Sequence, residues 1–292
     1  MESYGVLVGT EIISPIGLLK ALKFPPPLSL DEVITLGKGG IDIIEQLMKY
    51  STNAEKKDAT ISIEEVAISP PVPSPPKIIC LGLNYRDHAK EAKAKIPKEP
   101  VIFMKPRTAV IGSEQPIILP SFVKQLDYEA ELAMVIGRRG KDISVSDAKD
   151  YIFGYTAFND VSARDIQFKD KQWTRGKSFD TFAPMGPCIT TANQIRNLND
   201  LCICTRVNGE LRQNSSTKNM VLAVYEVVHY LSLVMTLEPG DVIATGTPAG
   251  VGVFMKPEPK FLSSGDVVEI EIEGIGTLRN RIAESGSKQV LS

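Results

Sequence analysis

The chain has 292 residues, of which 43% are hydrophobic and 23% charged, and its formal net charge is −2. This length and composition are typical of a globular protein with one large core and a small additional domain. The near-zero net charge, without any run of Lys and Arg, argues against binding to nucleic acid or to an anionic membrane surface.

The N-terminus, the apolar runs and the cysteines of the chain indicate no secretory, membrane-spanning or zinc-binding role. The first five residues lack the basic flank of a secretory signal, and no stretch approaches the roughly 18 uninterrupted apolar residues of a membrane span. We therefore expect a cytoplasmic protein. Cys80 and Cys188 fit small core residues. Cys202 and Cys204 share one face of an expected strand, but with only two His in the chain a zinc site is not expected.

The N-terminal part differs in pattern from the rest. Residues 1–68 show a weak strand at 5–8 and helical runs near 16–22 and 40–48, without a catalytic constellation. We predict that they form a small N-terminal domain. The proline-dense residues 69–76 are predicted to be an extended connector, and residues 77–292 to form a β-rich catalytic domain.

A polar helix is expected at residues 84–93, after a strand at 77–81, with Asn84 as a possible N-cap. His88 and Glu91 are three residues apart on it and therefore share a face. A carboxylate beside an imidazole fixes its tautomer and raises its basicity, as a general base for water requires. The alternative is a solvated helix that carries an incidental pair.

Residues 126–137 read as a β-strand with one apolar face and one acidic face. Asp127, Glu129 and Glu131 alternate with apolar residues, so they share a side. Same-face neighbours lie roughly 6.5 to 7 Å apart at the backbone, and like charges held that close call for a compensating cation. The pattern predicts a site for a hard divalent metal.

Further polar residues follow expected strands downstream. Asp160 ends a strand at 154–158, where it can either cap a short helix or bind a metal. Residues 173–187 read as an irregular loop that carries the cations Arg175 and Lys177. Asn208 and Gly209 indicate a hairpin turn.

The last third of the chain supplies core elements and a glycine-bearing loop. A helix is expected at 220–235, burying Val221, Val224, Val228 and Leu231, with His229 and Glu226 in structural roles. Residues 239–243 and 264–268 each predict a tight turn that starts a strand. The glycines of residues 244–252 could let backbone amides approach an anion, but the segment lacks the features of a nucleotide-binding loop.

Several motifs together resemble the fumarylacetoacetate hydrolase family, in the family's order from about Lys77 to Ile282. They are Gly82-Leu83-Asn84-Tyr85 with Asp87-His88, Asp127-Tyr128-Glu129-Ala130-Glu131-Leu132, Asn159-Asp160-Val161-Ser162-Ala163-Arg164-Asp165, Gly176-Lys177-Ser178-Phe179-Asp180 and Thr245-Gly246-Thr247-Pro248. The resemblance implies an α+β, mainly β fold, a mixed β-sheet roll, with a small N-terminal α/β domain, and it implies a homodimer.

The same resemblance implies roles for individual residues. Glu129, Glu131 and Asp160 would ligate one Mg²⁺ or Mn²⁺, in agreement with the acidic strand, and Asp127 would be structural. Lys177 matches a lysine that neutralises charge beside the metal. Arg164 and Gln167 match substrate-binding positions that help bind an oxyanion, and Thr247 matches a threonine that contacts the substrate. His88 and Glu91 match a water-activating dyad on a lid that orders over bound substrate.

The resemblance thus predicts a metal-dependent hydrolase that cleaves a carbon–carbon bond in a β-diketo acid, of acylpyruvate or fumarylpyruvate type, through a metal-stabilised enolate. Alternatives are isomerisation of 2-hydroxyhepta-2,4-diene-1,7-dioate, decarboxylation of oxaloacetate and conversion of a 3-deoxy-2-oxo sugar acid. A remote alternative is a catalytically silent metal-binding scaffold. The groups that read the distal end of the substrate are expected in residues 92–100 or 168–174.

Overall fold

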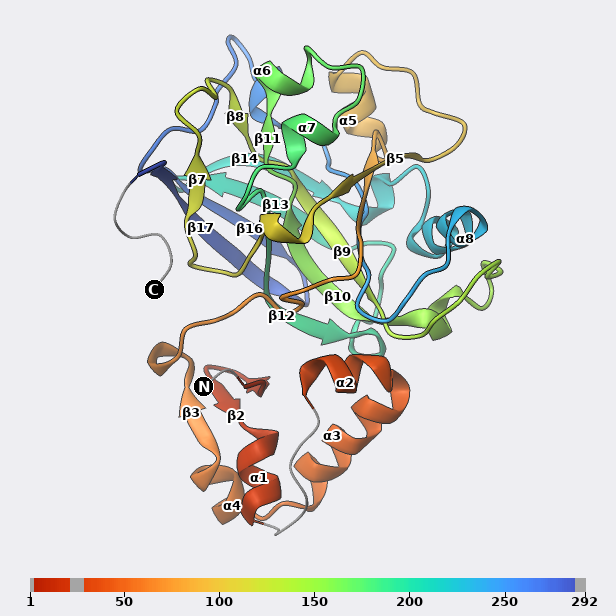
Figure 1. Ribbon diagram of the computed structural model, residues 1–292, viewed down its shortest axis with the longest axis vertical. Coiled ribbons are helices and arrows are strands. Elements are labelled where there is room, and N and C mark those ends of the chain that lie inside the picture. Colours follow the sequence, from red (N-terminus) through yellow and green to blue (C-terminus); the bar gives the residue numbers. More distant parts are fainter. Residues whose placement is uncertain (1–2, 22–28, 287–292) are drawn as a thin grey trace.

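The structure is a computed structural model and describes residues 3–21 and 29–286 (Figure 1). A small N-terminal lobe lies at one end of the molecule and a larger β-rich body at the other. In its described residues the lobe contains a three-stranded antiparallel sheet and four helices. Its elements are β1 (Val6–Val8), β2 (Glu11–Ile13), α1 (Pro15–Ala21), α2 (Leu30–Thr35), α3 (Lys38–Tyr50), α4 (Asn53–Asp58), β3 (Thr60–Ser62) and the 3₁₀ turn η1 (Ile63–Glu65).

The elements expected in this lobe are confirmed. β1 lies in the predicted strand, α3 covers the predicted helix at 40–48, and α1 covers the described part of the run near 16–22, whose last residue lies outside the described residues. Helices α2 and α4 begin at capping boxes, in which Ser29 and Thr52 exchange hydrogen bonds with the Glu three residues later.

The lobe packs directly onto the body. Val33 and Ile34 of α2 are buried in one apolar cluster with Ala133 and Val135 of the body. The proline-dense residues 69–76 form neither helix nor strand and turn at several bends. The expectation of a continuously extended connector is therefore wrong, because Val72 folds into that same cluster.

The body consists of curled mixed sheets, so the predicted α+β, mainly β class is confirmed. One sheet has seven strands in the order β5-β4-β15-β9-β10-β12-β6, and another has five in the order β14-β13-β16-β17-β7. The strands are β4 (Ile78–Gly82), β5 (Val101–Lys105), β6 (Val110–Ile111), β7 (Ile117–Leu119), β8 (Leu126–Asp127), β9 (Ala130–Ile136), β10 (Ile152–Asn159), β11 (Ser162–Ala163), β12 (Ala183–Thr191), β13 (Cys202–Val207), β14 (Glu210–Ser216), β15 (Val242–Ala244), β16 (Val267–Ile272) and β17 (Gly276–Glu284).

Few α-helices accompany these sheets. They are α5 (Arg86–Glu91), α6 (Arg164–Gln167), α7 (Thr174–Lys177) and α8 (Val224–Val234), with 3₁₀ turns at Arg107–Ala109, Ala148–Tyr151, Ala192–Gln194, Thr217–Asn219 and Gly252–Phe254. Helices α5, α6 and α7 gather at the end of the body opposite the N-terminal lobe (Figure 1). None of the helices within the described residues combines the length and apolarity needed to cross a membrane.

The expected acidic strand is interrupted, which corrects the simple two-faced pattern. β8 ends at Asp127 and β9 begins at Ala130, so Tyr128 and Glu129 form a break. The N–H of Glu129 donates to the Asn159 side chain, and its carbonyl accepts from the N–H of Asp160. All seven residues of β9 are buried, because apolar clusters cover both of its faces.

Three local expectations differ from the structure. Helix α5 begins at Arg86 without a side-chain cap from Asn84, whose amide instead bonds with Leu222 and the Thr245 carbonyl. Asp160 caps no helix, since α6 begins four residues later. Residues 173–187 are not wholly irregular, because they contain α7 and the start of β12.

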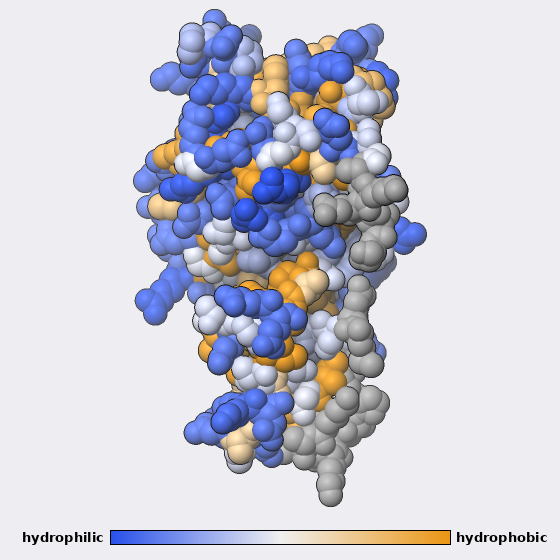
Figure 2. All heavy atoms as spheres, turned by 90° about the vertical axis from the view of Figure 1, so that its left-hand side faces the viewer, coloured by the Kyte–Doolittle hydropathy of each residue, from blue (hydrophilic) through white to orange (hydrophobic). Residues whose placement is uncertain are grey.

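Other expectations in the body are confirmed. Asn208 and Gly209 have positive φ angles of 51° and 80° at the β13–β14 turn. Helix α8 buries Val224, Val228 and Leu231, whereas Val221 lies before the helix and is half-buried. The chain turns at 239–243 and 264–268 and then enters β15 and β16. On the face drawn in Figure 2 hydrophilic residues dominate, and hydrophobic residues form small islands.

Candidate active site

Three buried carboxylates meet where β9 and β10 lie side by side. Glu129 stands in the break before β9, Glu131 on β9, and Asp160 directly after β10. Oxygen atoms of the three side chains all lie within 4.8 Å of one another. The structure therefore brings together the three residues expected to bind a metal.

The geometry of Glu131 fits a cation. Its Oε2 accepts a hydrogen bond from the Gly246 N–H at 2.8 Å, but its Oε1 is buried without a hydrogen-bond partner in the described residues. Burial, followed by repulsion from Asp160 and Glu129, raises the pKa of this carboxyl well above its ordinary value. An all-oxygen donor set with one unsatisfied oxygen suits a hard ion such as Mg²⁺ or Mn²⁺.

Two cationic side chains form ion pairs with Glu129. Lys177 Nζ lies 2.9 Å from Glu129 Oε2 and 2.7 Å from Asp160 Oδ2, and Arg164 lies 2.7 Å from Glu129 Oε1. Burial alone would raise the pKa of Glu129, but attraction to Lys177 and Arg164 outweighs it and holds the pKa well below the usual range. Burial opposes the charge of Lys177 as well, yet Asp160 and Glu129 raise its pKa.

Lys105 is a third buried cation, which the sequence reasoning missed. Its Nζ lies 2.6 Å from Asp160 Oδ1 and donates to the carbonyls of Val161, Lys177 and Phe182. Burial lowers the pKa of Lys105 despite the attraction to Asp160. The only sequence signal is a lysine at the end of an otherwise apolar strand, followed by Pro106.

The charges of this buried cluster nearly balance. Three of the four buried carboxylates, Asp127, Glu129 and Asp160, are in contact with the three buried cations, and Glu131 lies beside them without an ion pair in the described residues. With all groups ionised, the cluster carries one excess negative charge. A bound divalent cation would leave one excess positive charge, which favours an anionic ligand.

Asp127 supports the cluster from behind, as expected. It accepts hydrogen bonds from the N–H groups of Tyr128, Gly252 and Val253 and from Arg164 Nε at 2.9 Å. The amides of the glycine-bearing loop thus bind carboxylates of the protein itself, where the sequence had suggested an external anion.

The dyad residues lie on α5 at the mouth of the same region. His88 Nδ1 is 3.4 Å from Glu91 Oε2, and the Gly250 N–H donates to both Glu91 oxygens at 3.0 and 3.2 Å. His88 is 8% exposed and packs against Phe254, with ring centroids 6.0 Å apart. The pair is therefore a largely buried, oriented arrangement, unlike the solvated surface helix considered from the sequence.

His229, the second histidine of the chain, makes different contacts from His88. His229 Nδ1 lies 2.6 Å from the Ile143 carbonyl, and Glu226 caps the Ala223 N–H at the start of α8. His229 and Glu226 thus each bond to backbone groups, which suits the structural roles expected for them.

A cavity of about 200 Å³ connects these groups. Its polar lining contains six of the nine expected site residues, namely His88, Glu129, Arg164, Gln167, Lys177 and Thr247. Its apolar lining consists mainly of Leu81, Leu83, Phe103, Phe168, Trp173 and Phe254. The other three expected residues do not line the cavity. Glu91 contacts His88, Glu131 contacts Gly246, and Asp160 contacts Lys177.

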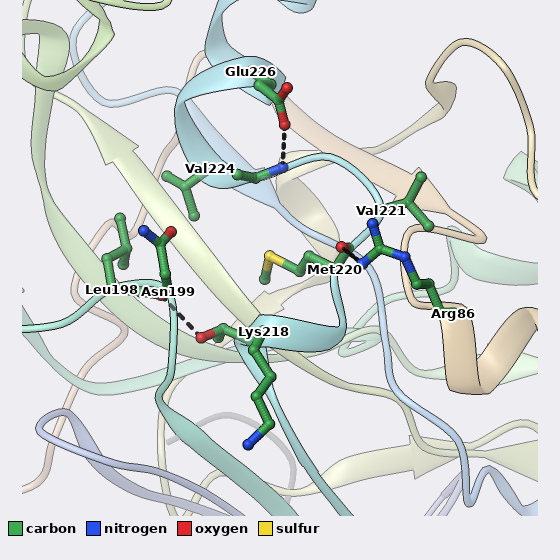
Figure 3. Close-up of a pocket in the computed structure, with 10 residues that line it drawn as sticks. Arg86, Leu198, Asn199, Lys218, Met220, Val221, Val224 and Glu226 are labelled. Carbon is green, nitrogen blue, oxygen red and sulfur yellow. Dashed lines mark hydrogen bonds between the residues drawn. The ribbon is translucent and has the colours of Figure 1, made fainter.

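A larger hollow of about 420 Å³ lies beside the start of α8 and contains none of the expected site residues (Figure 3). Arg86, the first residue of α5, points into it and donates to the Met220 carbonyl. Polar and apolar residues mix there without a carboxylate cluster. We therefore place the candidate active site in the smaller cavity.

The chain is similar in sequence to known proteins. The profile of the fumarylacetoacetate (FAA) hydrolase C-terminal domain matches residues 77–283. The mitochondrial oxaloacetate tautomerase of Bos taurus is 41% identical over 282 residues, which cover 95% of this chain and 88% of that protein.

Solved structures are also similar to this chain in sequence and in fold. A fumarylacetoacetate hydrolase from Exiguobacterium antarcticum is 39% identical, with a TM-score of 0.80 over 96% of this chain and 94% of that one. A 2-hydroxyhepta-2,4-diene-1,7-dioate isomerase from Mycobacterium marinum is 44% identical, with a TM-score of 0.69 over 78% of this chain and 82% of that one.

Proposed function

Because the chain belongs to the fumarylacetoacetate hydrolase family, whose members include hydrolases, isomerases and tautomerases, we propose that it hydrolyses a carbon–carbon bond in a small β-diketo acid of the acylpyruvate or fumarylpyruvate type. The observation that carries this proposal is the shared cavity. An oriented histidine and a cationic, carboxylate-rich cluster open onto the same space of about 200 Å³.

Glu129, Glu131 and Asp160 would hold Mg²⁺ or Mn²⁺, which supplies a positive charge that polarises the 2-oxo group of the substrate and favours its enolate. The apolar lining of the cavity lowers the local dielectric constant and strengthens the attraction between the metal ion and the 2-oxo group. The small volume favours short substrates.

Glu91 holds the His88 ring, and His88 removes a proton from a water molecule. The water oxygen attacks the distal carbonyl of the substrate, and the bond between that carbon and carbon 3 then breaks. The electron pair of the broken bond stays on the pyruvate part as its enolate, which takes up a proton at carbon 3. The products are pyruvate and a carboxylic acid.

Lys177 is the best placed donor to negative charge on the substrate. Two of its three N–H groups bond Glu129 and Asp160, which leaves the third for a substrate oxygen. Arg164 already contacts Asp127, Glu129 and Gln167, so its contribution is to position those groups and to add positive charge.

A second candidate is the tautomerisation of oxaloacetate. Its support is that the Bos taurus tautomerase matches 95% of this chain, the N-terminal lobe included. His88 would then carry a proton between carbon 3 and the 2-oxygen, and no bond between carbons would break. Isomerisation of a dienoic diacid, decarboxylation of oxaloacetate and conversion of a deoxy sugar acid require the same enolate and stay open.

The chain offers a matched pair of variants to test the proposal, because it contains only two histidines. We expect His88→Gln to lose turnover of acylpyruvates and of oxaloacetate, since the proton acceptor is gone, and to keep its metal content. We expect His229→Gln to keep turnover, since His229 bonds to the Ile143 carbonyl and contacts the Tyr230 ring, outside the candidate site. Ultraviolet loss of substrate, with a coupled assay for pyruvate, measures both.

The pyruvate assay separates the two candidates, because tautomerisation changes the enol absorbance without releasing pyruvate. Turnover by His88→Gln at the wild-type rate, or activity that survives exhaustive chelation, would contradict the proposed mechanism. A protein inert toward every such acid, with and without Mg²⁺ or Mn²⁺, would favour a silent metal-binding scaffold. The homodimer and the cytoplasmic location stay predictions of this proposal.

A further inference from the structure

Gln213 is a buried side chain to which the sequence assigned no role. It lies on β14, is fully buried, and uses every hydrogen-bonding group of its amide. Its Oε1 accepts from the Ala130 N–H at 3.0 Å and from the Thr205 hydroxyl at 2.7 Å. Its Nε2 lies 2.8 Å from Thr247 Oγ1 and 2.9 Å from the Pro248 carbonyl.

The partners fix which way this amide faces. A backbone N–H can only donate and a backbone carbonyl can only accept, so the Gln213 oxygen must face Ala130 and the nitrogen must face Pro248. A flipped amide would set an N–H against the Ala130 N–H and an oxygen against the Pro248 carbonyl. Thr247 Oγ1 is therefore the acceptor in its bond with Gln213.

This arrangement determines what Thr247 can offer to a ligand. Because its oxygen accepts from Gln213, its hydroxyl hydrogen is left for another partner, and the structure shows no acceptor for that hydrogen in the described residues. Thr247 lines the same cavity as His88 and Lys177. Accepting a hydrogen bond also polarises the hydroxyl and strengthens it as a donor.

We infer that Gln213 is a positioning residue that presents Thr247 as a hydrogen-bond donor to a carboxylate or carbonyl oxygen, and that this selects oxo acids over ligands with a hydrogen-bond donor at the same position. The identity of the ligand as an oxo acid rests on the proposed function. The direction of the hydrogen bond rests only on the partners of Gln213.

The test compares two ligands of nearly equal shape, oxalate and oxamate, because oxamate replaces one carboxylate oxygen by an NH₂ group. Binding to the full-length protein is measured by isothermal titration calorimetry in Mg²⁺. We expect the wild-type protein to bind oxalate more tightly than oxamate. The variant Gln213→Glu keeps the shape and the oxygen that faces Ala130 but replaces the amide nitrogen by an acceptor, so the Thr247 hydroxyl turns to donate to it.

Gln213→Glu also adds a carboxyl whose charge disfavours the dianion oxalate more than the monoanion oxamate, so the neutral variant Gln213→Met decides the test. We expect Gln213→Met to lower the ratio of oxalate to oxamate affinity by about 10- to 100-fold, the usual effect of a hydrogen bond to a charged group. Thr247→Val should lower the ratio similarly, Thr247→Ser should preserve it, and the double variant should lose no more than either single variant. The ratio is insensitive to the fraction of folded protein, so partial unfolding does not imitate the effect.

The ratio falls in Gln213→Met because the Thr247 hydroxyl is then free to turn, and Gln213→Glu should lower the ratio as well. An unchanged ratio in the Gln213 variants beside a lowered ratio in Thr247→Val would overturn the role of Gln213. An unchanged ratio in Thr247→Val, or a wild-type protein that binds neither ligand, would overturn the inference itself. The turnover assay tests the proposed function separately, because the ratio requires binding and no reaction.

Discussion

Glu131→Gln should have opposite effects on stability without and with metal. Without metal, the substitution removes one of three carboxylates whose oxygens lie within 4.8 Å of one another. Two full unit charges at that distance would repel by roughly 3.5 kcal/mol at an effective dielectric constant of 20. The raised pKa of Glu131 and the charge of Lys177 both reduce this cost. The Gln oxygen can still accept from the Gly246 N–H. We expect the metal-free variant to be more stable than the wild type by about 1 to 3 kcal/mol.

With metal, the order should reverse. A ligand at 100 times its Kd stabilises the folded wild type by about 2.7 kcal/mol, which corresponds to a rise in Tm of roughly 5 °C for a chain of this size. The variant lacks one ligand and should gain little. Thermal unfolding in chelator and in Mg²⁺ measures both effects, with Glu114→Gln, an exposed carboxylate paired with Arg279, as the control. An equal Mg²⁺-induced rise in Glu131→Gln and wild type would refute the assignment of Glu131 as a ligand.

Two further substitutions test the surroundings of the site. Lys105→Met should lower the free energy of unfolding by about 3 to 5 kcal/mol in chemical denaturation, because it leaves the Asp160 charge buried with one cation fewer. As a control, substitution of an exposed lysine, Lys38→Met, should change the free energy of unfolding by less than about 0.5 kcal/mol. Equal effects of the two substitutions would contradict the reasoning. Gly82→Ala should shift the fluorescence of Trp173, the only tryptophan in the chain, and weaken substrate binding. The reason is that the added Cβ would lie 2.1 Å from the indole ring, which lines the cavity. An unchanged emission spectrum and an unchanged KM would show that the ring moves aside without affecting the cavity.

The sequence located the charged side chains of the site better than it described the backbone that holds them. Glu129, Glu131 and Asp160 stand out because carboxylates are unusual among apolar strand residues, and the structure brings them together. The break at Glu129 was not predictable, because the alternating pattern continues through it. It depends on a long-range partner, the Asn159 side chain, that periodicity does not reveal.

The supporting residues escaped prediction for a related reason. Lys105 and Gln213 look like ordinary strand residues, and their roles follow only from contacts with Asp160 and Thr247, which lie 55 and 34 positions away. Asn84 has the composition of an N-cap, but tertiary partners at Leu222 and Thr245 outcompete the local hydrogen bond.

The glycine-bearing loop also bears on how the protein acquires its activity during folding. Gly246, Gly250 and Gly252 donate backbone hydrogen bonds to Glu131, Glu91 and Asp127, so one short segment contacts the metal cluster, the dyad and the supporting carboxylate. These contacts span 115 to 159 positions of the chain. Bringing such distant segments together costs loop-closure entropy before any contact is gained, which slows folding. A nascent chain that has not yet reached residue 252 therefore lacks an assembled site, and competence for catalysis arises only after this loop has been synthesised.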